Sequence, residues 1–216
     1  MPLLVDEAAR QIAITRWGLP ECIHVPIAAA DETAIRAYIG EAQPIGGPPY
    51  RAFLVIIPHS TVIDPLLPIS CHPNVGVLFA RRQLWVNISY DGYRSAYRKA
   101  FSGENIDGRI LSHAMNRRTA ALKGFDFVRV TLASRANNSS SSFSEKWGVE
   151  LHSSERAKAI RGVRPPYIQY ADLSDLMLML DMRIGGGIMD AVNEGQKLVE
   201  PRTNAVGCNN AVRSAD

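Results

Sequence analysis

The chain has 216 residues, of which 46% are hydrophobic and 21% are charged, and its formal net charge is +3 at pH 7. This composition predicts a globular domain with a substantial core and excludes an intrinsically disordered chain. No run approaches the roughly 18 apolar residues of a membrane span. Asp6, Glu7 and Arg10 interrupt the N-terminus, where a secretory signal would be apolar. The sequence therefore predicts a soluble, cytoplasmic protein.

The cysteines, Cys22, Cys71 and Cys208, are far apart and have no Cys-x-x-Cys spacing. An odd number at such distances indicates neither a disulfide framework nor a cysteine zinc site. All three are expected to be reduced thiols.

The first 45 residues are expected to form a helix, a connector and a second helix that covers DETAIRAYIGEA (31–42), with Asp31 as its N-cap. Two glycines and three prolines in PIGGPP (44–49) then stop regular structure. RAFLVIIP (51–58) is a continuous apolar run with β-branched residues, which is typical of a strand buried on both faces.

Residues 58–73 are interrupted by prolines and predict a loop, which contains His59 and His72. Neither histidine has a partner at metal-ligand spacing, so both are expected to play loop roles. GVLFA (76–80) and QLWVNIS (83–89) are candidate strands. The second alternates apolar and polar residues, which predicts one buried face.

YDGYRSAYRKAF (90–101) predicts a helix on which Tyr93 and Tyr97 share an aromatic stripe with Phe101. The stripe is expected to face the core, although aromatic and cationic side chains together also clamp nucleic acid. The cations on this helix are expected to remain outside the stripe and to face a ligand; they are Arg94, Arg98 and Lys99.

The central segment predicts a strand, a helix, a strand and a loop in that order. DGRILSH (107–113) is expected to be a strand that ends at His113, and AMNRRTAALK (114–123) a helix that stops at Gly124. FDFVRVTLA (125–133) is expected to be the next strand, followed by Asn137, Asn138 and a helix that starts with the capping box SFSE (142–145).

The middle of the chain is basic. Residues 81–135 contain eleven Lys and Arg against four Asp and Glu, a balance of +7, which leaves −4 for the rest of the +3 chain. Such a local positive field is typical of proteins that bind phosphate-rich partners, and a solvated arginine-rich surface is the alternative.

A histidine at a strand end, followed by a strand, an asparagine and a helix, suits a phosphodiesterase site with one metal ion. Histidine takes a proton from water near neutral pH, and an asparagine carbonyl is an acceptable ligand for Mg²⁺ or Mn²⁺. Arginines hold phosphate through two hydrogen bonds. The expected phosphate contacts are Arg117, Arg118, Arg129 and Arg135, together with Arg94, Arg98 and Lys99.

Residues 105–155 resemble the HNH, or ββα-metal, nuclease superfamily in its divergent bacterial forms. The likeness rests on His113, Asn116, Arg117, Gly124, Phe125, Val128, Arg129, Arg135, Asn138 and Glu145. It implies that His113 is the general base, that Asn138 is a metal ligand and that His152 takes the place of the last histidine of the motif. Ser112 stands where many members carry an acidic metal ligand.

Each of these residues also has a structural interpretation. His113 is equally compatible with a satisfied histidine at a strand end, and Asn137 and Asn138 with ordinary loop residues. The capping box accounts for Glu145. Arg129 is expected at the catalytic site, with pairing to a buried acid as the alternative.

The last part of the chain predicts two helices, over 172–184 and 188–200, followed by a frayed tail over 201–216. The sequence thus predicts an α/β (α+β) protein with a mixed sheet and flanking helices. An N-terminal scaffold (1–80), a basic core with the ββα-metal-like unit (81–170) and C-terminal helices (171–200) are expected to form one compact domain.

The leading functional hypothesis is a divalent-metal-dependent nuclease that acts on DNA or RNA. A nucleic-acid-binding protein without catalysis is the first alternative. A homo-oligomeric interaction module, built on the Leu and Met face of the C-terminal helices, is the second.

Overall fold

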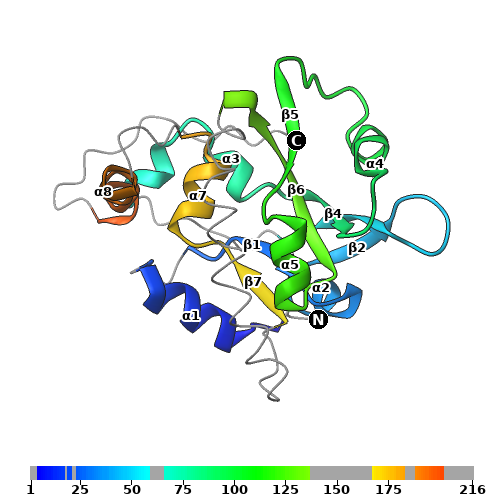
Figure 1. Ribbon diagram of the computed structural model, residues 1–216, viewed down its shortest axis with the longest axis horizontal. Coiled ribbons are helices and arrows are strands. Elements are labelled where there is room, and N and C mark those ends of the chain that lie inside the picture. The colour runs from blue at the N-terminus through cyan, green and yellow to red at the C-terminus, as the bar shows by residue number, and fades with distance from the viewer. Residues whose placement is uncertain are drawn as a thin grey trace.

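A computed structural model describes residues 4–17, 19–20, 23–58, 66–136, 167–182 and 188–201 (Figure 1). The fold combines helices with one curled sheet, which confirms the predicted α/β (α+β) class. The elements in chain order are α1 (Glu7–Trp17), β1 (Pro26–Ala29), α2 (Glu32–Tyr38), β2 (Glu41–Pro44), β3 (Ala52–Ile56), η1 (Pro68–Cys71), α3 (Val75–Leu78), β4 (Arg82–Asn87), α4 (Tyr93–Ala100), β5 (Arg109–His113), α5 (Arg117–Lys123), β6 (Phe127–Ser134), β7 (Ile168–Tyr170), α7 (Leu173–Met179) and α8 (Ile188–Val199).

The sheet has seven strands in the order β2-β3-β4-β6-β1-β7, and β5 pairs with β6 outside this path. Every described ladder is antiparallel, which corrects the expectation of a mixed sheet. Strands from the predicted N-terminal scaffold and from the predicted basic core share this one sheet. The two segments therefore have a common framework.

Strand β6 organises the sheet because three strands pair with it. Val130 faces Leu84 of β4 on one side and His113 of β5 on the other. Val128 faces β4 on the first side and Ala28 of β1 on the second. Strands β5 and β1 therefore lie end to end along the same side of β6, and His113 sits where β5 gives way to β1.

Alternation along the strands divides the core into two clusters, one on each face of the sheet. Val128 and Leu84 belong to the larger cluster, whereas Phe127, Trp85 and Phe53 belong to the smaller one. Strand β4 is thus buried on both faces, and the prediction of a single buried face was wrong. The buried polar groups of β4 bond to each other, since Trp85 donates from Nε1 to the Gln83 side-chain oxygen at 3.1 Å.

The strand–helix–strand order predicted for the middle of the chain is confirmed. Strand β5 ends at His113, and the Asn116 side chain accepts hydrogen bonds from the backbone nitrogens of Arg118 and Thr119 at the start of α5. Gly124 ends α5 with φ of 84°, a left-handed conformation that favours glycine. Local capping signals fix the ends of this helix.

Two of the helix starts predicted elsewhere are also confirmed. The Asp31 side chain accepts a hydrogen bond from the backbone nitrogen of Ala34 at 2.7 Å and caps α2. Asp172 and Asp175 form a reciprocal capping box at the start of α7.

Other expectations were wrong. GVLFA (76–80) overlaps the short helix α3 and forms no strand, because a run of four apolar residues does not distinguish a helix from a strand. Residues 1–45 include strands β1 and β2, which the helix–connector–helix prediction missed. Strand β1 has the sequence PIAA, whose proline and alanines carry no strand preference.

Cys71 is disulfide-bonded, which corrects the expectation that it is a reduced thiol. The other two cysteines lie outside the described residues. Separation along the chain did not reveal this bond, because folding brings distant residues together. Disulfides are most common in oxidising compartments, so the bond does not favour the cytoplasmic location that the sequence suggests.

The C-terminal helices pack on the chain's own core. Leu173, Leu176 and Met179 of α7 are buried in the larger cluster. In α8, Gly195 lies so close to α7 that an added Cβ would be 2.7 Å from Met177 Sδ. This apolar face is therefore occupied within the chain, and the structure gives no support to its use as an oligomer contact.

Arg129 is a fully buried cation in β6. Its guanidinium donates to the carbonyl oxygen of Leu78 at 3.0 Å and to that of Val77. Burial lowers the pKa of Arg129 to about 9, so the side chain is still protonated at pH 7. No carboxylate pairs with it among the described residues. Arg129 thus ties the end of α3 to the central strand.

We predict that Arg129→Met lowers the free energy of unfolding by about 2–4 kcal/mol, because it leaves two buried carbonyl groups without donors. Arg129→Lys should recover part of the loss, since an ammonium group still donates. Urea unfolding followed by tryptophan fluorescence measures both effects.

Arg109→Met is the matched control, because Arg109 is exposed on the neighbouring strand β5. It should change the free energy by no more than about 0.5 kcal/mol. An Arg129→Met protein as stable as this control would contradict the structural role of Arg129.

Candidate functional site

His113 owes its position to the junction of three elements. It pairs with Val130 as the last residue of β5, and the backbone nitrogen of Ala114 then donates to the Arg129 carbonyl oxygen at 2.8 Å. Beyond that bond the chain leaves the sheet and enters α5 at Asn116. The histidine therefore projects from a rigid strand end beside the first turn of a helix.

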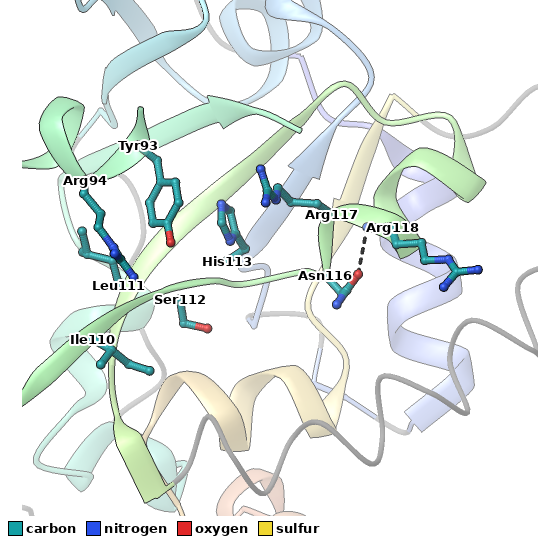
Figure 2. Close-up of a pocket in the computed structure, with 9 residues that line it drawn as sticks. All are labelled: Tyr93, Arg94, Ile110, Leu111, Ser112, His113, Asn116, Arg117 and Arg118. Carbon is teal, nitrogen blue, oxygen red and sulfur yellow. Dashed lines mark hydrogen bonds between the residues drawn. The ribbon is translucent and has the colours of Figure 1, made fainter. Parts of the chain in front are cut away.

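A pocket of about 520 Å³ opens beside His113 (Figure 2). Its walls come from the first turn of α4, from β5 and from the start of α5. The lining residues are Tyr93, Arg94, Ile110, Leu111, Ser112, His113, Asn116, Arg117 and Arg118. This set contains three arginines and no carboxylate, so the pocket carries a positive field and suits an anionic ligand.

The imidazole of His113 lies between Tyr93 and Arg117 (Figure 2). The Tyr93 ring meets it edge-on, with the ring centres 4.7 Å apart. Its Nε2 atom is buried and has no hydrogen-bond partner among the described residues. Burial, and secondarily the positive charge of Arg117, lower the pKa of His113 to about 4. The ring is therefore neutral at pH 7 and able to accept a proton.

The arginines are held by different contacts. Arg117 donates from Nη1 to the Asp91 carboxylate at 2.9 Å and to the Ile88 carbonyl oxygen at 3.3 Å. The guanidinium of Arg94 lies over the Tyr93 ring, 5.7 Å from its centre. Arg118 extends from the far side of the α5 start, away from His113 (Figure 2). Of the three arginines, Arg117 thus points most directly toward His113 (Figure 2).

The Asp91 contact is weak and reversible. Its side chain is 88% exposed and that of Arg117 is 37% exposed, so water screens the pair. Surface pairs of this kind contribute at most about 1 kcal/mol. A ligand phosphate is able to compete with Asp91 for the Arg117 guanidinium.

The structure gathers four of the residues predicted from the sequence into this pocket, namely His113, Arg94, Arg117 and Arg118. Three further predicted cations are exposed outside it: Arg98 and Lys99 on α4, and Arg135 just after β6. Arg129 does not line the pocket, because its guanidinium is committed to α3. The remaining predicted residues lie outside the described part of the chain; they are His59, Asn137, Asn138, Glu145 and His152.

Tyr93 was expected to face the core with Tyr97. Tyr97 is buried, and the half-buried Tyr93 both packs against the larger core cluster and forms a wall of the pocket. Tyr93 is the first residue of α4, which begins directly after the turn at Asp91 and Gly92. This position was the sequence signal for the pocket role, because a side chain in the first turn of a helix need not share the buried face of the later turns.

The described residues of the pocket do not fit a divalent metal ion. Its side-chain oxygens other than the Tyr93 hydroxyl belong to Ser112 and Asn116, and the Asn116 oxygen already accepts two backbone hydrogen bonds. Within the described ranges no group of three or more His, Cys, Asp or Glu side chains is placed to hold a metal. Hard cations require several oxygen ligands. The predicted ligands Asn138 and His152 lie outside the described residues.

No protein family, characterised protein or solved structure matches the chain. The resemblance to ββα-metal nucleases therefore stays a prediction. No helix in the described segments is long and apolar enough to cross a membrane.

We predict that His113 makes the protein lose stability as the pH falls. Its pKa is about 4 in the folded chain and 6.5 in its unperturbed state. Between these values the unfolded chain binds a proton that the folded chain does not, so stability declines from about pH 6.5 down to about pH 4. Relative to His113→Gln, the wild type should lose about 2–3 kcal/mol between pH 7 and pH 4.5.

Urea unfolding of both proteins at the two pH values measures this loss. All other titrating groups are shared, so the difference between the proteins isolates His113. Parallel losses in the wild type and the variant would show that the histidine is not buried in its neutral form.

Proposed function

We propose that the protein binds nucleic acid and that the pocket beside His113 holds a backbone phosphate. The observation that carries this proposal is the meeting of Arg94 and Arg117 with a neutral histidine in a pocket that Arg118 also lines and whose lining residues include no carboxylate. Guanidinium groups donate paired hydrogen bonds to phosphate oxygens. Because the imidazole is neutral, it adds no positive charge that would repel the neighbouring guanidinium groups.

The charge outside the pocket supports a polymeric ligand rather than a single phosphate. Arg98 follows Arg94 by four residues on α4, so both emerge from the same face of that helix. Arg98 and Lys99 are exposed. A strand that places one phosphate beside His113 has further cations for its next phosphates, and each contact releases counterions.

Phosphodiester cleavage is a second candidate function, and one specific observation favours it. The imidazole of His113 lines the pocket, is neutral at pH 7 and accepts no hydrogen bond at Nε2 in the described chain, so this residue is the candidate general base. The sequence resemblance to ββα-metal nucleases points to the same residue. Mg²⁺ or Mn²⁺ remains the cofactor that this resemblance implies.

We predict that Arg94→Gln and Arg117→Gln each reduce the salt dependence of nucleic-acid binding. Each lost phosphate contact should lower the slope of log K against log salt by about 0.7 to 0.9. Fluorescence anisotropy with labelled oligonucleotides at several salt concentrations measures these slopes.

Arg36→Gln is the control, because Arg36 pairs with Glu32 on α2 and does not line the pocket. It should leave the slope unchanged. A protein whose binding loses as much from Arg36→Gln as from Arg117→Gln would bind through diffuse charge, and the pocket would not be the phosphate site.

We also predict that Asp91→Asn strengthens binding by about two- to fivefold. The substitution removes the carboxylate that competes with phosphate for Arg117, and exposed pairs of this kind contribute up to about 1 kcal/mol. The gain should disappear in an Arg117→Gln background. An equal gain in both backgrounds would mean that Asp91 acts through overall charge alone.

A further inference from the structure

The pocket presents an uncommon set of groups for phosphodiester chemistry. It offers the neutral imidazole of His113 as a proton acceptor, and cations on Arg94 and Arg117. In the described chain it lacks the anionic oxygens that would hold a divalent cation, and its arginines repel one. Water activated by a metal is therefore not the nucleophile that these residues favour.

One class of substrate carries its own nucleophile. In RNA the 2′-hydroxyl is adjacent to the phosphorus atom of the same nucleotide, so attack is intramolecular and gains from proximity. This reaction requires a base for the hydroxyl proton and donors for the charge that develops on the phosphate oxygens. The pocket supplies both kinds of group.

We propose, resting on the nucleic-acid-binding function proposed above, that the pocket cleaves RNA by attack of the 2′-hydroxyl with His113 as the base. The imidazole of His113 takes the 2′-hydroxyl proton, and the 2′-oxygen forms a bond to phosphorus. The bond from phosphorus to the 5′-oxygen breaks, and this oxygen takes a proton from water. The products are a 2′,3′-cyclic phosphate and a 5′-hydroxyl, and His113 returns its proton to solvent.

The positions of the cations suit the charge that this step creates. Arg117 extends toward His113 in Figure 2, so a phosphate bound by its guanidinium lies next to the imidazole. Arg94 reaches the same pocket from α4. Both are able to donate to the non-bridging oxygens, whose negative charge increases in the transition state.

The bound phosphate also improves the base. Burial is the larger cause of the low pKa of His113, and the positive charge of Arg117 is the smaller one. A phosphate that neutralises Arg117 removes the smaller effect, so the imidazole becomes more basic when the substrate is in place. The Tyr93 ring, in edge-on contact with His113, keeps the imidazole oriented and acts as a positioning residue.

The test uses the full chain with three labelled single strands of one mixed sequence: RNA, DNA and 2′-O-methyl RNA. Each strand is incubated with excess chelator and, separately, with Mg²⁺. We expect RNA to be cut in both conditions, with a cyclic phosphate identified by mass spectrometry. DNA and 2′-O-methyl RNA should be bound and left intact.

His113→Gln should reduce RNA cleavage by about 10² to 10⁴-fold, which is the usual contribution of a positioned base. Its affinity for RNA should stay within about threefold of the wild type, because the arginines carry the binding. Arg36→Gln should cut RNA at the wild-type rate. Unfolding of each variant in urea at pH 7 verifies that the fold is retained.

Three outcomes would overturn the inference. Cutting of DNA or 2′-O-methyl RNA would show that the nucleophile is not the 2′-hydroxyl, and cleavage that stops in chelator would show that a metal takes part. RNA that is bound but left intact would remove the cleavage step and leave the binding function standing. Failure to bind any of the three strands would overturn both proposals.

Discussion

The succession of β5 and β1 along one side of β6 is the constraint on which the site depends. Because β1 takes over the pairing at Val128, β5 ends at His113 and the chain turns away into α5. A rigid strand end and a helix start thus meet at one point. The central strand is itself anchored by Arg129, which binds the carbonyl groups at the end of α3. A histidine on a free loop would have neither the burial nor the fixed neighbours that set its chemistry.

The electrostatics of the pocket follow from this arrangement. Three arginines from two helices line the pocket without a carboxylate beside them, and the nearby Asp91 pairs with Arg117 from an exposed position. Burial, together with the nearby Arg117 charge, disfavours the protonated form of His113, so the histidine is neutral and adds no positive charge to the pocket. An anionic ligand relieves the repulsion among the arginines and raises the basicity of the imidazole. In the proposed reaction, binding and chemistry are therefore coupled through the same charges.

The sequence predicted this part of the molecule better than the rest, for local reasons. The cap at Asn116 and the left-handed Gly124 define α5 within a few residues, and simple charge counting identified the basic segment. Strands β1 and β7, of four and three residues, carry too little pattern to be recognised without their partners. The role of Arg129 depends on carbonyl groups about 50 residues away in sequence. No local signal distinguishes such a buried cation from one that faces a phosphate.

The most direct test is to measure the pKa of the His113 imidazole by NMR, with the free protein and with a saturating uncleavable 2′-O-methyl oligonucleotide. We expect a pKa near 4 in the free protein and a clear rise when the strand is bound. The rise should be smaller in Arg117→Gln. A pKa near the ordinary value of 6.5 that does not respond to a bound strand would contradict the central claim that a phosphate enters the pocket beside a buried, neutral histidine.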